Sequence, residues 1–142
     1  RGFWNMRKTK PYHLLVADDD ARFRSVLRSL LEPWFELFEA SSGERAVEIV
    51  EDRRIDLLLL DMHMEELTGI ETVEIVKRIN SRLPCILVTG DATDEVVEKA
   101  TKADIWSVLS KPVRRVDLMA TVSAAIDNFY DDPDVFSGFS TN

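Results

Sequence analysis

The chain has 142 residues, of which 45% are hydrophobic and 31% are charged, and its formal net charge is −8. These values are typical of one globular domain with a hydrophobic core, and the negative charge argues against a broad surface for nucleic-acid phosphates. No apolar stretch approaches the roughly 20 residues of a transmembrane helix, and no signal-peptide pattern is present. We therefore expect a cytoplasmic protein that does not bind membranes. The first residue is Arg1 rather than Met, which suggests a trimmed or excised fragment.

Short apolar runs alternate along the chain with segments of helical periodicity. The runs predict buried strands, and the periodic segments predict helices that are apolar on one face. In chain order we expect strand 12–17, helix 21–32, strand 35–39, helix 42–52, strand 55–60, helix 68–80, strand 84–88, helix 93–102, strand 106–109 and helix 114–130. Asp20 is placed to cap the first helix, and Pro33 is placed to end it.

Five strand–helix units predict an α/β fold. Helices of this length between strands imply crossover connections and a parallel sheet covered on both faces. We expect the doubly wound, flavodoxin-like arrangement with strand order 2-1-3-4-5. Residues 1–11 are predicted to form an N-terminal arm, residues 12–130 the domain, and residues 131–142 a tail or linker stub. Cys85 is the only cysteine, and its apolar neighbours predict a buried, inert thiol.

Polar residues follow four of the predicted strands. Asp18 and Asp19 follow the first strand, Asp61 the third, Thr89 the fourth and Lys111 the fifth. Right-handed crossovers bring the carboxyl ends of parallel strands to one edge of the sheet, where α/β proteins bind their ligands. The sequence therefore predicts three carboxylates, one hydroxyl and one ammonium group in one shallow pocket.

This set of groups indicates a particular chemistry. Crowded carboxylates repel one another unless a cation joins them, and oxygen ligands with open positions suit Mg²⁺. A carboxylate neutralised by a metal can attack phosphorus, while a lysine and a hydroxyl hold the oxygens of the transferred phosphoryl group. The residues fit Mg²⁺-assisted phosphoryl transfer to Asp61.

Four motifs, each at a predicted strand end, carry a resemblance to a known family. They are Val16-Ala17-Asp18-Asp19-Asp20 with Arg24 shortly after, Leu60-Asp61-Met62-His63-Met64 closing on Gly69, Val88-Thr89-Gly90, and Lys111-Pro112. With them the chain resembles the receiver domain of bacterial two-component response regulators over about residues 12–130. Each motif alone is weak, but all four in this order are specific.

The resemblance implies a phosphoacceptor and a metal site. Asp61 is expected to accept a phosphoryl group from the histidine of a sensor kinase or phosphotransfer protein. Asp19 and Asp61 are expected to bind Mg²⁺ directly, together with the backbone carbonyl of His63, and Asp18 is expected to assist, often through water. Such a domain is not an enzyme, although it has intrinsic Mg²⁺-dependent self-phosphorylation and dephosphorylation chemistry.

The resemblance also implies how the signal leaves the site. Lys111 is expected to contact the phosphoryl group, and Thr89 to turn toward it and change the surface around segments 93–102 and 106–109. Receivers often form homodimers through these two segments and the helix at 114–130. No nucleic-acid binding is expected of this domain itself.

Several positions depart from the usual family pattern or modify it. Val108 stands where an aromatic switch residue is usual, and Trp106, two positions earlier, is expected to point to the same face. Glu65 stands where proline is frequent. His63 and Asp91, two positions after the phosphoacceptor and the switch hydroxyl, are predicted to tune the lifetime of the acyl phosphate.

Other functions were weighed against this one. A pseudo-receiver, which keeps the fold as an interaction module without being phosphorylated, is the main alternative. A phosphatase of the haloacid-dehalogenase type is disfavoured because His63 occupies the position of its second acid. A nucleotide-binding flavodoxin-like domain is disfavoured because no Gly-rich loop follows the first strand.

Overall fold

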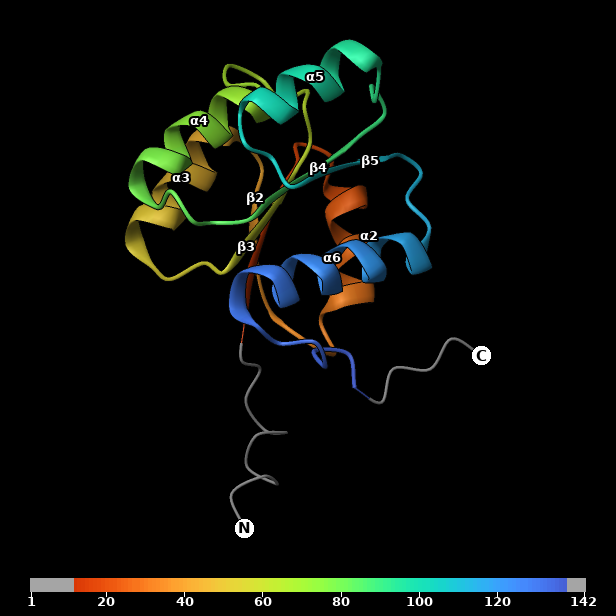
Figure 1. Ribbon diagram of the computed structural model, residues 1–142. Coiled ribbons are helices and arrows are strands. Elements are labelled where there is room, and N and C mark those ends of the chain that lie inside the picture. The colour runs from red at the N-terminus through yellow and green to blue at the C-terminus, as the bar shows by residue number, and fades with distance from the viewer. Residues whose placement is uncertain (1–11, 138–142) are drawn as a thin grey trace.

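Five parallel strands form one sheet in the order β2-β1-β3-β4-β5, and each strand is followed by a helix (Figure 1). The computed structural model describes residues 12–137, so the predicted arm at 1–11 lies outside the described residues. In chain order the elements are β1 (His13–Ala17), α2 (Ala21–Leu31), β2 (Glu36–Ala40), α3 (Gly43–Asp52), β3 (Leu57–Leu60), α4 (Gly69–Ile79), β4 (Cys85–Thr89), α5 (Asp94–Lys102), β5 (Ser107–Ser110) and α6 (Arg115–Tyr130). The predicted α/β, doubly wound, flavodoxin-like fold with strand order 2-1-3-4-5 is confirmed.

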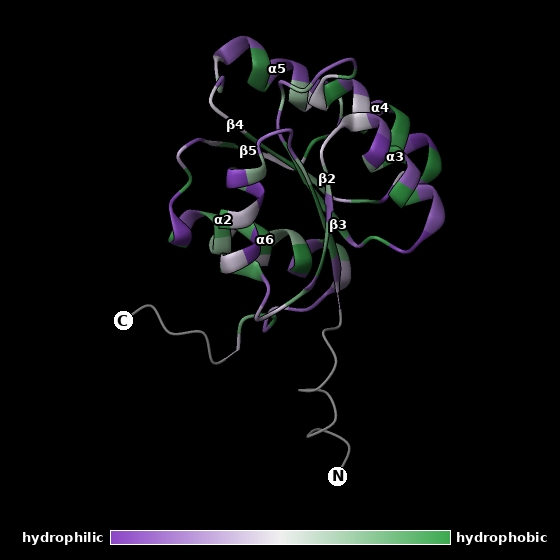
Figure 2. Cartoon of the chain, turned by 180° about the vertical axis from the view of Figure 1, so that it is seen from behind, coloured by the Kyte–Doolittle hydropathy of each residue, from purple (hydrophilic) through white to green (hydrophobic). Residues whose placement is uncertain are grey.

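The sheet separates two hydrophobic layers. Helices α3, α4 and α5 cover one face, and α2 and α6 cover the other (Figure 1). The leucines of β3 alternate between the layers: Leu58 and Leu60 pack on the first, Leu57 and Leu59 on the second. Because both faces are covered, this strand is apolar at every position. Hydrophobic residues are accordingly concentrated along the strands and on part of each helix surface (Figure 2).

Local side-chain contacts set the ends of several elements. The Asp20 carboxylate accepts a hydrogen bond from the backbone N–H of Arg22 at 2.9 Å, which confirms its predicted capping role. After α2 the backbone continues in a turn, because the N–H of Phe35 still donates to the carbonyl of Leu31 at 3.1 Å. Strand β2 therefore begins one residue later than predicted, at Glu36.

Three apolar residues of the helices are exposed rather than buried. Val26 is 50% exposed, Ile79 42% and Val116 48%. Each belongs to a helix whose sheet contact is made by other apolar residues, such as Leu27 and Leu31 of α2. Helical periodicity identifies the apolar side of a helix, but only the packing decides where its buried stripe ends.

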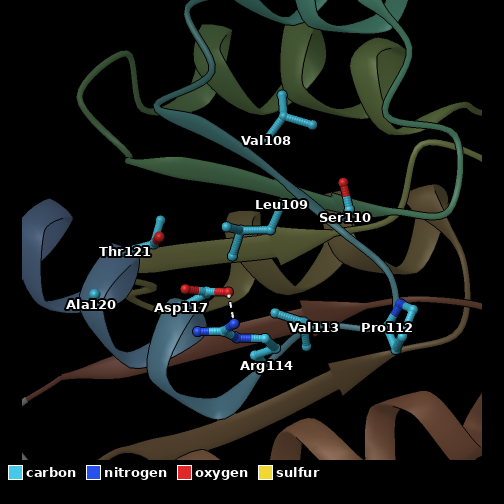
Figure 3. Close-up of a pocket in the computed structure, with 9 residues that line it drawn as sticks. All are labelled: Val108, Leu109, Ser110, Pro112, Val113, Arg114, Asp117, Ala120 and Thr121. Atoms are coloured by element: carbon cyan, nitrogen blue, oxygen red, sulfur yellow. Dashed lines mark ion pairs between the residues drawn. The ribbon is translucent and has the colours of Figure 1, made fainter.

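Trp106 and Val108 pack against different parts of the domain. Trp106 lies directly before β5, which begins at Ser107, although its backbone N–H still donates to the carbonyl of Cys85 at 2.8 Å. Its ring meets Phe129 of α6 edge-on, with 5.6 Å between ring centroids. Val108 packs instead on the layer that contains α5, and it points away from α6 (Figure 3). The prediction that both side chains share a face is wrong.

The segment after α6 folds back onto the domain as far as it is described. Asp132 accepts a hydrogen bond from the Tyr12 hydroxyl at 2.6 Å. The ring of Phe136 meets those of Trp34 and Phe35 edge-on, with 5.5 Å between centroids in each pair. Residues 131–137 thus cover part of the α2–α6 layer, while the domain boundary after residue 130 stays a prediction.

The Cys85 thiol is expected to be unreactive in the folded protein. Cys85 is fully buried, and this burial raises the pKa of the thiol to about 12, so the reactive thiolate is scarce at neutral pH. A chromogenic disulfide reagent at pH 8 should label almost no protein natively and one thiol per chain in urea. Rapid labelling of the native protein would contradict the buried placement.

No helix within residues 12–137 combines the length and apolar character needed to cross a bilayer.

Candidate functional site

The hydrogen-bond ladder of the sheet continues one residue past the strands and fixes the functional side chains. Asp18, Asp61 and Lys111 directly follow β1, β3 and β5. The backbone N–H of each donates to the carbonyl of the last residue of a neighbouring strand, in β2, β1 and β4, at 3.0, 3.1 and 2.9 Å. The three residues therefore start from fixed backbone positions at the carboxyl edge of the sheet, where ligands bind in this fold.

Three carboxylates meet at this edge. Oxygen atoms of Asp18, Asp19 and Asp61 lie within 4.8 Å of one another. Asp18 and Asp61 are buried, and Asp19 is exposed. The Oδ1 atom of Asp61 is buried without a hydrogen-bond partner, which is costly for a carboxylate oxygen. A cation bound among the three acids would satisfy that oxygen, so the residues fit the Mg²⁺ that the sequence predicted.

Lys111 joins the two buried acids. Its Nζ atom lies 2.8 Å from Asp18 Oδ2 and 3.3 Å from Asp61 Oδ2. Burial disfavours the charged ammonium, but the hydrogen bond to Asp18 and the nearby negative charges outweigh it and raise the pKa of Lys111. For Asp18 the balance is opposite, since burial outweighs the bond to Lys111 and raises the pKa of its carboxyl. A lysine this close to Asp61 can donate hydrogen bonds to the oxygens of a group attached to that carboxylate.

Thr89 is the last residue of β4, and its side chain is fully buried. Its hydroxyl oxygen accepts a hydrogen bond from the backbone N–H of Asp91 at 3.2 Å. Among the described hydrogen bonds the hydroxyl is therefore bound within its own loop rather than to Asp61 or Lys111. The expected turn of Thr89 toward a phosphoryl group stays a prediction.

His63 and Asp91 connect the loops after β3 and β4. The His63 Nε2 atom lies 2.6 Å from Asp91 Oδ2, and both side chains are exposed. Sequence analysis singled out both residues but not their contact, because they are 28 positions apart. The expected use of the His63 backbone carbonyl as a metal ligand stays a prediction.

Gly69 allows the loop after Asp61 to close. Gly69 is the first residue of α4, and its backbone N–H donates to the carbonyl of Met62 at 2.8 Å. A Cβ atom at this position would overlap the carbonyl oxygen of Asp61 and lie 3.0 Å from Leu87 Cδ1. The close approach of α4 to the loop after β3 therefore requires glycine.

Two neighbours of the site were not given a role by sequence analysis. The Lys111 ammonium lies 4.2 Å from the centre of the Phe23 ring, a distance suited to a cation–π contact. The Arg24 guanidinium donates to the backbone carbonyl of Asp18 and also pairs with Glu39. Phe23 and Arg24 lie in the first turn of α2, directly after the acidic loop. This closeness in sequence was the one indication that they could contact the site.

A separate cleft of about 440 Å³ lies between β5 and α6 (Figure 3). Leu109 points into it from β5, and Arg114 and Asp117 pair across its rim at 3.2 Å. Asp18, Asp19 and Asp61 do not line this cleft. Its place beside β5 makes it part of the surface that joins α5, β5 and α6, which we call the α5–β5–α6 face.

A doubly wound sheet with an acidic cluster and a lysine at its carboxyl edge is the arrangement that the motifs predicted for a receiver domain. The chain belongs to the response regulator receiver domain family, whose family model matches residues 14–123. This confirms the family that the motifs indicated.

Curated relatives include two kinds of protein. The transcriptional regulatory protein ZraR of Escherichia coli O157:H7 is 34% identical over 114 residues, which are 80% of this chain and 26% of ZraR. The chemotaxis protein CheY of Halobacterium salinarum is 32% identical over 111 residues, covering 78% of this chain and 92% of CheY. The chain thus spans about a quarter of the length of the first relative and nearly all of the second.

Solved structures share the fold. A CheY-like receiver domain from Methanospirillum hungatei matches with a TM-score of 0.81 and 23% identity, over 84% of this chain and 97% of that one. A receiver domain from Clostridium thermocellum matches with a TM-score of 0.78 and 28% identity, over 82% of this chain and 95% of that one.

Proposed function

We propose that this receiver domain accepts a phosphoryl group on Asp61 from a sensor histidine kinase or a phosphotransfer protein. The observation that carries the proposal is the setting of the Asp61 carboxylate. One of its oxygens is buried without a partner, and the other lies 3.3 Å from the Lys111 ammonium. Asp18 and Asp19 stand beside it, with oxygens within 4.8 Å.

The proposed step is a displacement at phosphorus. A carboxylate oxygen of Asp61 attacks the phosphorus of a phosphohistidine, the new O–P bond forms as the N–P bond breaks, and the imidazole leaves with the electron pair. Lys111 meets the charge on the phosphoryl oxygens, while the fixed backbone of Asp61 holds the nucleophile in line. Acetyl phosphate can replace the protein donor, with acetate as the leaving group.

The residues that would hold Mg²⁺ are Asp18, Asp19, Asp61 and the backbone carbonyl of His63. A bound ion would neutralise the crowded carboxylates and supply positive charge for the transferred phosphoryl group. Lys111 already pairs with both buried acids. We infer that this lysine exchanges part of that pairing for the phosphoryl group after transfer.

We further propose that phosphorylation changes the α5–β5–α6 face through Thr89. The buried hydroxyl of Thr89 would leave the N–H of Asp91 for a phosphoryl oxygen, and the loop before α5 would follow. Homodimers through this face are one outcome in keeping with its mixed charges. Since Val108 is not aromatic, the movement would reach this face through the loop and not through a switch ring.

Incubation with acetyl phosphate tests the proposal and its main alternative. Intact-mass measurement should show one phosphoryl group per chain when Mg²⁺ is present and none when a chelator removes it. A pseudo-receiver, for which the small Val108 is the favouring observation, would give no adduct with any donor and no response to beryllofluoride.

The His63–Asp91 pair is expected to lengthen the lifetime of the phosphoryl group. The pair joins the loop that contains Asp61 to the loop after β4, and we expect it to limit the approach of water. Replacing either residue with alanine should speed hydrolysis by about two- to tenfold, in line with typical coupling energies between paired side chains. The double variant should match either single one, because both singles break the same contact. Unchanged hydrolysis in all three variants would remove the idea.

A further inference from the structure

The backbone of Asp18 forms hydrogen bonds with residues of both α2 and β2. Its N–H donates to the carbonyl of Ala40 at 3.0 Å, and its carbonyl accepts a hydrogen bond from Arg24 Nη1. That carbonyl belongs to the peptide unit between Asp18 and Asp19. The orientation of this peptide unit therefore affects the positions of the Asp18 and Asp19 side chains.

Arg24 is itself held in place by an acid. Its Nε atom lies 3.0 Å from Glu39 Oε1, and the Arg24 side chain is only 16% exposed. Glu39 directly precedes Ala40, the residue that accepts the hydrogen bond from Asp18. One short piece of β2 thus holds the acidic loop both directly, through Ala40, and indirectly, through Glu39 and Arg24.

The ion pair persists because Glu39 stays ionised. Burial opposes the charge on Glu39, but hydrogen bonds from Arg28 and Arg24 outweigh it and lower the pKa of the carboxyl. The side chain of Glu39 is 30% exposed, so solvent reaches the pair only in part. Arg24 uses two nitrogens of one rigid, planar guanidinium, Nε toward Glu39 and Nη1 toward the Asp18 carbonyl, so it is a more rigid support than a surface lysine.

We propose that Arg24, held by Glu39, is a positioning residue that fixes the peptide between Asp18 and Asp19 for cation binding. The inference rests on the proposed function, since it supposes that these acids bind Mg²⁺. This ion demands near-ideal octahedral geometry, so a small rotation of the peptide weakens binding. Groups that orient metal ligands without touching the metal typically change its affinity about 10–100-fold when removed.

The chain offers a matched control for a purely structural role. Arg28, one turn further along α2, also pairs with Glu39, at 2.6 Å, and with Glu32, at 2.7 Å. Its described partners do not include the acidic loop. Arg28→Ala therefore removes two ion pairs from the same helix and leaves the contact with the Asp18 carbonyl in place.

Calorimetric titration of the unphosphorylated protein with MgCl₂ tests the proposal. Arg24→Ala should weaken Mg²⁺ affinity about 10–100-fold, and Arg28→Ala should stay within about twofold of the wild type, the range of ordinary surface changes. Arg24→Lys should restore part of the affinity, because an ammonium can donate to the Asp18 carbonyl. Glu39→Gln should weaken affinity less than Arg24→Ala, because the glutamine oxygen can still accept from Arg24.

The outcomes separate this inference from the proposed function. If the wild type binds Mg²⁺ and Arg24→Ala binds it equally well, the positioning role is overturned and the phosphoacceptor proposal stands. If the wild type does not bind Mg²⁺, both are overturned. If circular dichroism shows that Arg24→Ala does not fold, the Mg²⁺ affinities of Glu39→Gln and Arg28→Ala are compared instead. Equal affinities in these two variants would overturn the positioning role of Arg24.

Discussion

Asp61→Asn is expected to abolish formation of the acetyl-phosphate adduct completely. An amide has no anionic oxygen to attack phosphorus, although asparagine keeps the size and most of the hydrogen bonds of aspartate. The fold should persist, because the backbone N–H of Asp61 still donates to β1 at 3.1 Å. Intact-mass measurement after incubation with Mg²⁺ and acetyl phosphate should show only the unmodified chain.

Asp56→Asn is the matched control for this substitution. Asp56 is 8% exposed and Asp61 9%, and the two residues flank opposite ends of β3. Asp56 accepts a hydrogen bond from the N–H of His13 at 2.7 Å, which asparagine can also accept. This variant should form the adduct like the wild type. An adduct retained in Asp61→Asn, or lost in both variants, would contradict the assignment of the phosphoacceptor.

Gly69→Ala is expected to destabilise the domain by about 1–3 kcal/mol or more, the usual cost of forcing atoms into a packed region. The added methyl group would overlap the carbonyl oxygen of Asp61, which is backbone and cannot move away cheaply. The start of α4 or the loop after β3 must shift, so Mg²⁺ affinity should fall together with stability. Urea denaturation followed by circular dichroism measures the first effect, and calorimetric titration the second.

Gly90→Ala shows whether this cost is specific to the crowded position. A Cβ atom at Gly90 meets nothing within 4 Å, although this residue also follows a strand at the edge of the site. The free energy of unfolding should change by less than about 1 kcal/mol. Equal destabilisation by the two substitutions would show that glycine flexibility, and not the approach to Asp61, explains Gly69.

The sheet topology could be predicted from sequence because the central strands β1, β3 and β4 are apolar and buried on both faces. The uninterrupted leucines of β3 have this pattern, and they separate into the two layers as expected. Since crossover handedness is nearly invariant, the strand order then determined which residues share an edge. Asp18, Asp61 and Lys111 meet there, as the sequence predicted.

Features that depend on packing could not be predicted in the same way. Val116 belongs to α6 but is not among its buried residues, and Trp106 lies just before β5. Phe136 was assigned to a tail, yet its ring packs on Trp34 and Phe35. Sequence periodicity describes only neighbouring residues, so it cannot predict such contacts between distant segments.

The support behind the acidic loop illustrates the same limit at the site. Arg24 was noticed as part of a motif, and Glu39 only as the end of a strand. Their ion pair and the bond to the Asp18 carbonyl need the register of β1 against β2, which pairs Val16 with Glu39. Motifs therefore identified the groups that carry the chemistry, and the structure identified those that hold them.

Reductive trapping of the phosphorylated protein tests the central claim most directly. Borohydride converts an aspartyl phosphate into homoserine, which peptide mass mapping then locates in the chain. We expect homoserine at position 61 after treatment with Mg²⁺ and acetyl phosphate, and none after treatment without Mg²⁺. Homoserine at Asp18 or Asp19 instead, or at no position, would contradict the proposal that Asp61 is the phosphoacceptor.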